Sequence, residues 1–213
     1  MKIHKIVLLL LASLFAFPAL AGMSPEIVTL SEEWAKIKYQ TPEEQRVAAL
    51  ESLNERAAKL VEAHPQDAAP LIWQAIILST TAGEKGGLGA LSLVKQAKKL
   101  LDQAEAMDPN ALDGSVYTSL GSLYYQVPGW PIGFGSDKKA QDYLHKALAV
   151  NPDGIDPNYF YGDFLLQEKE YSAAIDAFEH ALAAPARAER PIADAGRRSE
   201  IEAALAKAKA ALQ

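Results

Sequence analysis

The chain has 213 residues, of which 49% are hydrophobic and 23% are charged, and its formal net charge is −6. An acidic excess disfavours nucleic acid and anionic membrane surfaces as partners, because both attract basic proteins. The sequence contains no cysteine, which excludes disulfide bonds and a lipid-modified N-terminal cysteine.

The first 21 residues have the organisation of a secretory signal peptide. Lys2 and Lys5 open the segment, an apolar run covers 6–17, and Ala19-Leu20-Ala21 has the small-x-small pattern of a cleavage site. The sequence predicts cleavage at the Ala21-Gly22 bond and a soluble periplasmic protein made of one domain, 22–213. A retained anchor is the alternative, although the run is shorter than the ~20 apolar residues of a membrane span.

The rest of the chain is predicted to be helical. Ser31 is a candidate N-cap for the first helix, and Thr41 followed by Pro42 has the pattern of a second helix start. Later starts and stops are marked by proline, glycine and capping residues. The helices are expected at about 31–40, 42–64, 67–81, 90–107, 111–126, 137–150, 157–167, 171–184 and 192–212, the last as an Ala-rich C-terminal capping helix.

A spaced signature recurs along these helices. Its form is Ala, a large apolar residue four positions later, Ala three later and a terminating Pro, and small residues on one helical face allow a neighbouring helix to approach closely. An aromatic and Leu-Gly pattern precedes it, with Gly121 and Gly162 at the expected helix crossings. The signature alanines are Ala97, Ala104, Ala140, Ala147, Ala174 and Ala181.

This order of residues resembles the tetratricopeptide pattern, a helix-turn-helix unit of about 34 residues. The resemblance implies an all-α fold, a right-handed helical solenoid of about four helix pairs. The terminating prolines Pro65, Pro109, Pro152 and Pro185 show that the two middle units are longer than this period. We expect the extra residues to form two connectors, a glycine-rich one at 83–89 and an apolar one at 127–135.

The sequence offers no catalytic, cofactor or metal motif. His64, His145 and His180 have no partner at helical ligand spacing, and the 83–89 segment lacks the Gly-Lys-Ser/Thr ending of a phosphate loop. We therefore expect a protein that is not an enzyme and that uses no cofactor or metal ion.

Two surfaces are candidates for binding. The 127–135 segment carries Trp130 and Phe134 between prolines and glycines. It is interpreted either as a self-packed plug, which is favoured, or as a binding anchor. The second surface is the inner groove, with expected positions Ser115, Thr118, Ser122 and Tyr125 in one unit and Asp156, Tyr159, Asp163 and Leu166 in the next.

A cluster of arginines joins the last repeat to the final helix. It comprises Arg187, Arg190, Arg197 and Arg198. Structural ion pairs with Asp163, Glu189 or Asp194 are the favoured interpretation, because charges at a helix junction usually satisfy one another. An anion site is the alternative.

The stretch from about 113 to 200, with Val-Pro-Gly-Trp-Pro-Ile-Gly-Phe-Gly at 127–135, resembles exported bacterial tetratricopeptide proteins. These include the T-component family of tripartite ATP-independent periplasmic (TRAP) transporters. The resemblance implies a periplasmic scaffold that engages a partner protein such as a solute-binding protein, although the lipoprotein cysteine typical of T-components is missing. The alternative function is a small-molecule carrier for an apolar or amphipathic ligand.

Overall fold

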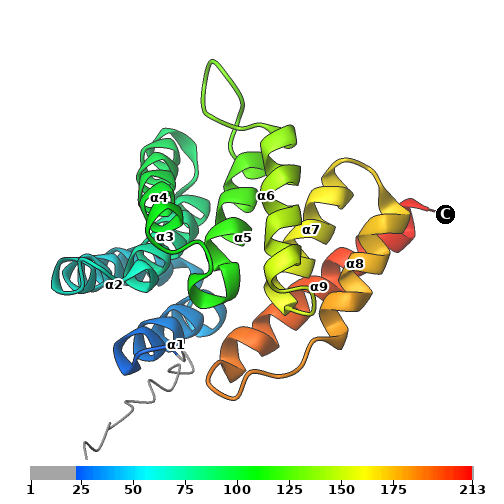
Figure 1. Ribbon diagram of the computed structural model, residues 1–213. Helices are drawn as coiled ribbons and strands as arrows, with labels where there is room; N and C mark the ends of the chain where they lie inside the picture. Colours follow the sequence, from blue (N-terminus) through cyan, green and yellow to red (C-terminus); the bar gives the residue numbers. More distant parts are fainter. Residues whose placement is uncertain (1–22, 213) are drawn as a thin grey trace, which may run out of the picture.

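The computed structural model describes residues 23–212, within which the chain is helical without a strand. The signal-peptide prediction for 1–21 lies outside these residues. Figure 1 shows the helices in chain order. They are α1 (Pro25–Gln40), α2 (Glu43–Ala63), α3 (Ala68–Lys85), α4 (Gly87–Met107), α5 (Ala111–Gln126), α6 (Asp137–Val150), α7 (Ile155–Gln167), α8 (Tyr171–Ala183) and α9 (Pro191–Ala211). No helix in this part of the chain is both long and apolar enough to cross a membrane.

The predicted all-α solenoid is confirmed. Consecutive helices pack as pairs, α3 with α4, α5 with α6 and α7 with α8, and neighbouring pairs stack on one another (Figure 1). The large apolar residues of the signature, Leu101, Leu144 and Phe178, are completely buried. The six signature alanines around them are at most 1% exposed, which is the burial that a stacked helical face requires.

Two glycines bring paired helices close together. A Cβ atom on Gly121 of α5 would lie 2.7 Å from Cγ of Leu144 on α6. A Cβ on Gly162 of α7 would lie 2.7 Å from Cδ1 of Phe178 on α8. Both distances are shorter than carbon atoms tolerate, so the helices cross at this separation because these positions carry no side chain.

The first two helices begin differently from the sequence prediction. Helix α1 starts at Pro25, where the Ser24 hydroxyl caps it, and Ser31 lies buried inside the helix. The Ser31 prediction is wrong because apolar residues further upstream, Ile27 and Leu30, are also buried and extend the helix. Helix α2 starts at Glu43, and the Thr41 hydroxyl instead donates to the Lys36 carbonyl of α1.

The predicted glycine-rich connector at 83–89 is also wrong. Helix α3 continues to Lys85 and α4 begins at Gly87. The turn is made at Gly86, which has a positive φ of 61° that glycine adopts without strain. The extra residues of this unit therefore lengthen its two helices and do not form a loop.

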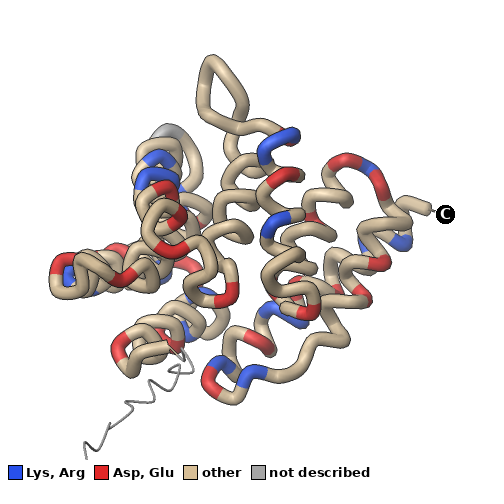
Figure 2. Tube along the Cα trace, in the orientation of Figure 1, with Lys and Arg blue, Asp and Glu red and all other residues tan. Residues whose placement is uncertain are grey.

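The connector after α5 is a true loop. It projects away from the stacked helices in Figure 1 and carries no charged residue in Figure 2. Its base is closed by a hydrogen bond from the Gly135 N–H to the Pro128 carbonyl, 3.0 Å, and by one from Ser136 N–H to Tyr124 carbonyl, 2.8 Å. The peptide bond between Trp130 and Pro131 is cis.

The last helix does more than cap the last repeat. Helix α9 packs against α7 and α8 and also against α1, so the first and last helices are in contact (Figure 1). Gly196 makes this approach possible, since a Cβ there would lie 2.4 Å from Cδ1 of Tyr39 on α1. The contact brings α1 and α9 together on the inner side of the solenoid.

Candidate functional site

The inner side of the solenoid contains a cavity of about 1040 Å³. Its walls come from every second helix, α1, α3, α5 and α7, and from α9 with the segments that precede α7 and α9. In a stack of helix pairs, the first helices of the pairs share the inner face, so residues distant in sequence meet there. A space of this size accommodates a small molecule or a short stretch of peptide.

One end of the cavity is aromatic. Trp34 of α1 and Trp73 of α3 contact each other edge to face, with ring centroids 5.8 Å apart, and both line the space. The Trp34 Nε1–H donates to the Thr80 hydroxyl at 2.9 Å. The Trp73 Nε1 atom is buried and has no hydrogen-bond partner among the described residues, which makes it an exception, since buried polar atoms are usually paired.

A wall of hydroxyl groups lies on α3 and α5. Several of these hydroxyls donate to a carbonyl of their own helix, as Ser79 does to Ala75 at 2.8 Å and Ser122 does to Ser119 at 2.9 Å. The proton of each of these hydroxyls is therefore already in a hydrogen bond, whereas its oxygen can still accept a hydrogen bond from a ligand. The hydroxyl residues that line the cavity are Ser79, Thr80, Ser115, Thr118, Ser119 and Ser122.

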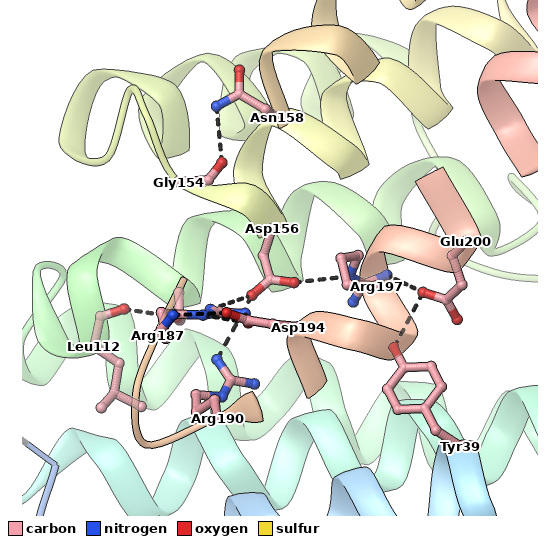
Figure 3. Close-up of polar contacts among 11 residues, drawn as sticks. Tyr39, Leu112, Gly154, Asp156, Asn158, Arg187, Arg190, Asp194, Arg197 and Glu200 are labelled. Atoms are coloured by element: carbon pink, nitrogen blue, oxygen red, sulfur yellow. Dashed lines mark hydrogen bonds and ion pairs between the residues drawn. The ribbon is translucent and has the colours of Figure 1, made fainter. Parts of the chain in front are cut away.

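The opposite side is charged, and Asp156 of α7 is at its centre. Arg187 Nη1 donates to one carboxylate oxygen at 2.8 Å, and Arg197 Nε donates to the other at 2.9 Å (Figure 3). Burial raises the pKa of Asp156, but Arg197, Arg187 and Arg190 together outweigh it and hold that pKa well below its usual range. Asp156 is therefore ionised at neutral pH.

Two further carboxylates pair with the same arginines. Asp194 accepts hydrogen bonds from the Arg187 backbone N–H and from Arg187 Nε, both at 2.8 Å. Glu200 accepts from Arg197 Nη1 at 2.6 Å and lies 3.3 Å from Lys38 Nζ. Burial raises the pKa of the nearby Tyr159 hydroxyl to about 12, although Arg197 opposes this.

Arg190 differs from its neighbours. Among the described residues its guanidinium makes no hydrogen bond, and its nearest carboxylate oxygen is on Asp156, 3.7 Å from Nη1. Its Nε atom is buried without a partner. The guanidinium carbon lies 5.2 Å from the Trp73 ring centroid, within the range of a cation–π contact.

The predicted groove residues fall into two groups. Ser115, Thr118, Ser122, Asp156 and Tyr159 line the cavity. Tyr125, Asp163 and Leu166 do not, and the Tyr125 hydroxyl donates instead to Asp163 at 2.7 Å between α5 and α7. Burial, with Asp163 adding to it, raises the pKa of Tyr125 well above its usual value. This pair joins two repeats.

The two aromatic residues of the 127–135 loop lie in different surroundings. Trp130 is 90% exposed at the tip, so the favoured prediction that it plugs the groove is wrong. Phe134 packs edge to face on Tyr124 of α5, with centroids 5.7 Å apart. The packing of Phe134 anchors the loop to α5. Trp130 is exposed to solvent, and so is Ile132, whose side chain is 64% exposed.

The arginine cluster forms the expected ion pairs, with partners that differ in part. Asp194 is a partner, but Asp163 binds Tyr125 and no ion pair of Glu189 is found among the described residues. Arg198 donates to the carbonyls of Leu182 and Ala184 instead. Sequence reasoning missed Asp156 as the shared partner and missed the contact of α9 with α1. The one available signal was Gly196, since a glycine inside an Ala-rich helix indicates a close approach.

Solved structures of MamA are similar to this chain. One has 20% sequence identity and a TM-score of 0.45, and the match covers 79% of this chain and 92% of that one. A second has 19% identity and a TM-score of 0.45, with 88% and 93% covered. No protein-family model matches the chain, and no curated protein sequence matches it.

Proposed function

We propose that this chain is a helical-repeat binding protein that holds a ligand in the cavity between α1, α3, α5, α7 and α9, without catalysing a reaction on it. The observation that carries the proposal is the contact of α9 with α1 on the inner face. An open solenoid presents a shallow groove, whereas this face forms a partly open cavity with aromatic, hydroxyl and charged walls. Such mixed walls orient a ligand that is itself amphipathic.

A second candidate function is that of an interaction scaffold. The exposed Trp130 and Ile132 at the tip of the 127–135 loop support it, because large exposed apolar residues on a rigid support are typical anchors at protein interfaces. On this proposal the partner is a periplasmic protein. The sequence resemblance to T-components suggests a solute-binding protein, and the scaffold then assists TRAP-type solute uptake.

Native mass spectrometry of the protein purified from its own source tests both functions. The variant Ser119→Trp places a large side chain in the cavity, because Ser119 lines it. Ser92→Trp is the matched control, since Ser92 is exposed on α4 and is not a cavity residue. Both variants are also compared by thermal melts to establish that they fold.

Ligand binding in the cavity predicts an added mass on the wild type and on Ser92→Trp that is lost from Ser119→Trp. An unmodified mass for the folded wild type contradicts this function. A co-purifying protein that is retained by Ser119→Trp and lost from Trp130→Ala supports the scaffold instead.

A further inference from the structure

One cation of the charged wall, Arg190, has no hydrogen-bonded carboxylate among the described residues. Arg187 is hydrogen-bonded to Asp156 and Asp194, Arg197 is hydrogen-bonded to Asp156 and Glu200, and Lys38 is paired with Glu200. Both oxygens of Asp156 are already engaged by Arg187 and Arg197. Arg190 is therefore the one arginine of the three whose guanidinium makes no hydrogen bond within residues 23–212.

We propose that Arg190 binds the carboxylate of a small ligand that carries an aromatic or apolar body. This inference rests on the proposed function of the cavity and names the chemical class of its ligand. Two buried N–H donors without partners, Arg190 Nε and Trp73 Nε1, mark the same end of the cavity. Arg190 lines the cavity, a carboxylate supplies the acceptor that its guanidinium lacks, and a guanidinium binds a carboxylate in bidentate fashion.

The charge of the ligand follows from the surroundings. One guanidinium without a hydrogen-bonded carboxylate matches one negative charge, whereas a phosphate ester with two charges would leave one of them unpaired. Four further carboxylates line the same space: those of Asp113, Asp153 and Glu189 are exposed, and that of Glu84 is paired with Arg46. They repel polyanions and leave Arg190 as the place where a monoanion is stabilised.

The aromatic or apolar character of the rest of the ligand is inferred from the neighbours of Arg190. The Trp73 ring lies against the guanidinium and Trp34 lies against Trp73, so a carboxylate bound to Arg190 is attached to a group beside two indole rings. Hydroxyl oxygens on α3 and α5 accept hydrogen bonds from amide or hydroxyl groups of the ligand. An N-acylated aromatic amino acid has all three features.

Isothermal titration calorimetry with N-acetyl-tryptophan and N-acetyl-tryptophan amide tests the inference. The two probes have the same shape and differ by one negative charge. The wild type is expected to bind the acid at least about tenfold more tightly than the amide, because an ion pair with the guanidinium replaces a hydrogen bond to an uncharged amide. Phenyl phosphate is expected to bind more weakly than the acid.

Variants test whether Arg190 causes the preference for the acid. Arg190→Gln is expected to bind acid and amide equally, and Arg190→Lys is expected to keep part of the preference. Lys38→Gln is the matched control, because it removes a cation from the same cavity that is already paired with Glu200; it is expected to keep the preference.

Each remaining outcome is decisive. Equal binding of acid and amide by the wild type, or a preference that survives Arg190→Gln, overturns the carboxylate inference while the proposed binding function stands. A preference lost equally in Lys38→Gln overturns the assignment to Arg190. If neither probe binds and native mass spectrometry finds no added mass, both the inference and the proposed function fail. If neither probe binds but a mass is added, only the inference fails.

Discussion

Tyr39 on α1 donates a hydrogen bond to Glu200 on α9 at 3.2 Å, although 161 positions separate the two residues. The ring of Tyr39 also covers Gly196, one turn earlier on α9. Lys38 adds an ion pair to the same Glu200. These contacts join α1 to α9 and form part of the cavity wall.

Gly196→Ala is expected to destabilise the protein by about 1–3 kcal/mol, the usual cost of overpacking. The new Cβ would lie 2.4 Å from the near edge of the Tyr39 ring, and α9 must move away from α1. Urea unfolding measures the change in the free energy of unfolding. In the Tyr39→Ala background the space is free, so the same change is expected to stabilise the helix by about 0.5–1 kcal/mol. A destabilisation that is equal in both backgrounds would show that the α1–α9 contact does not form in solution.

Gly121→Ala and Gly162→Ala are each expected to lower the free energy of unfolding by about 1–3 kcal/mol. Each new Cβ meets a buried side chain, Leu144 or Phe178, at 2.7 Å. Gly83→Ala is the control, since Gly83 lies in α3 with no atom within 4 Å of the added carbon. Gly83→Ala is expected to leave the stability unchanged or to raise it. Thermal melts compare the stabilities of the three variants. Unchanged melts for the first two would contradict the helix crossings at these glycines.

Trp130→Ala is expected to leave the stability within about 0.5 kcal/mol of the wild type, because the side chain is 90% exposed. Phe134→Ala is expected to lower the free energy of unfolding clearly, since Phe134 packs on Tyr124 at the base of the loop. If the loop is a binding anchor, Trp130→Ala also weakens the partner complex by about 2 kcal/mol or more. A pull-down with the native partner measures this. Binding equal to that of the wild type would remove Trp130 from the functional account.

Asp156→Asn is expected to destabilise the protein at pH 7 by about 1–3 kcal/mol, because it leaves the buried Arg197 and the half-buried Arg187 and Arg190 without their shared carboxylate. The pKa of Asp156 is depressed in the folded protein, so its contribution is present above the unfolded pKa of about 4 and is lost as the pH falls below that value. Urea unfolding of both proteins between pH 3 and pH 7 should show their difference shrinking towards the acidic end. A difference that is independent of pH would contradict the ion-pair role.

The repeat signature predicted the fold because it depends on short-range geometry. An Ala, a large apolar residue and a second Ala at helical spacing select one buried face whatever the rest of the chain does, and Leu101, Leu144 and Phe178 are indeed completely buried. The prediction that the extra residues of the longer units form loops was wrong for the 83–89 segment. Glycines at 83–89 suggested a loop, yet α3 and α4 continue through most of them, since packing between long helices outweighs the modest helical cost of glycine.

The sequence by itself therefore determined the all-helical class, the pairing of successive helices and the inner position of residues such as Ser122 and Tyr159. Only the tertiary structure decided that Asp156 meets three arginines, that Asp163 pairs with Tyr125 and that the Arg190 guanidinium makes no hydrogen bond. The physical reason is that each pair of helices rotates slightly against the next. Those rotations accumulate along the array, and their sum sets which distant charges meet where α9 returns to α1.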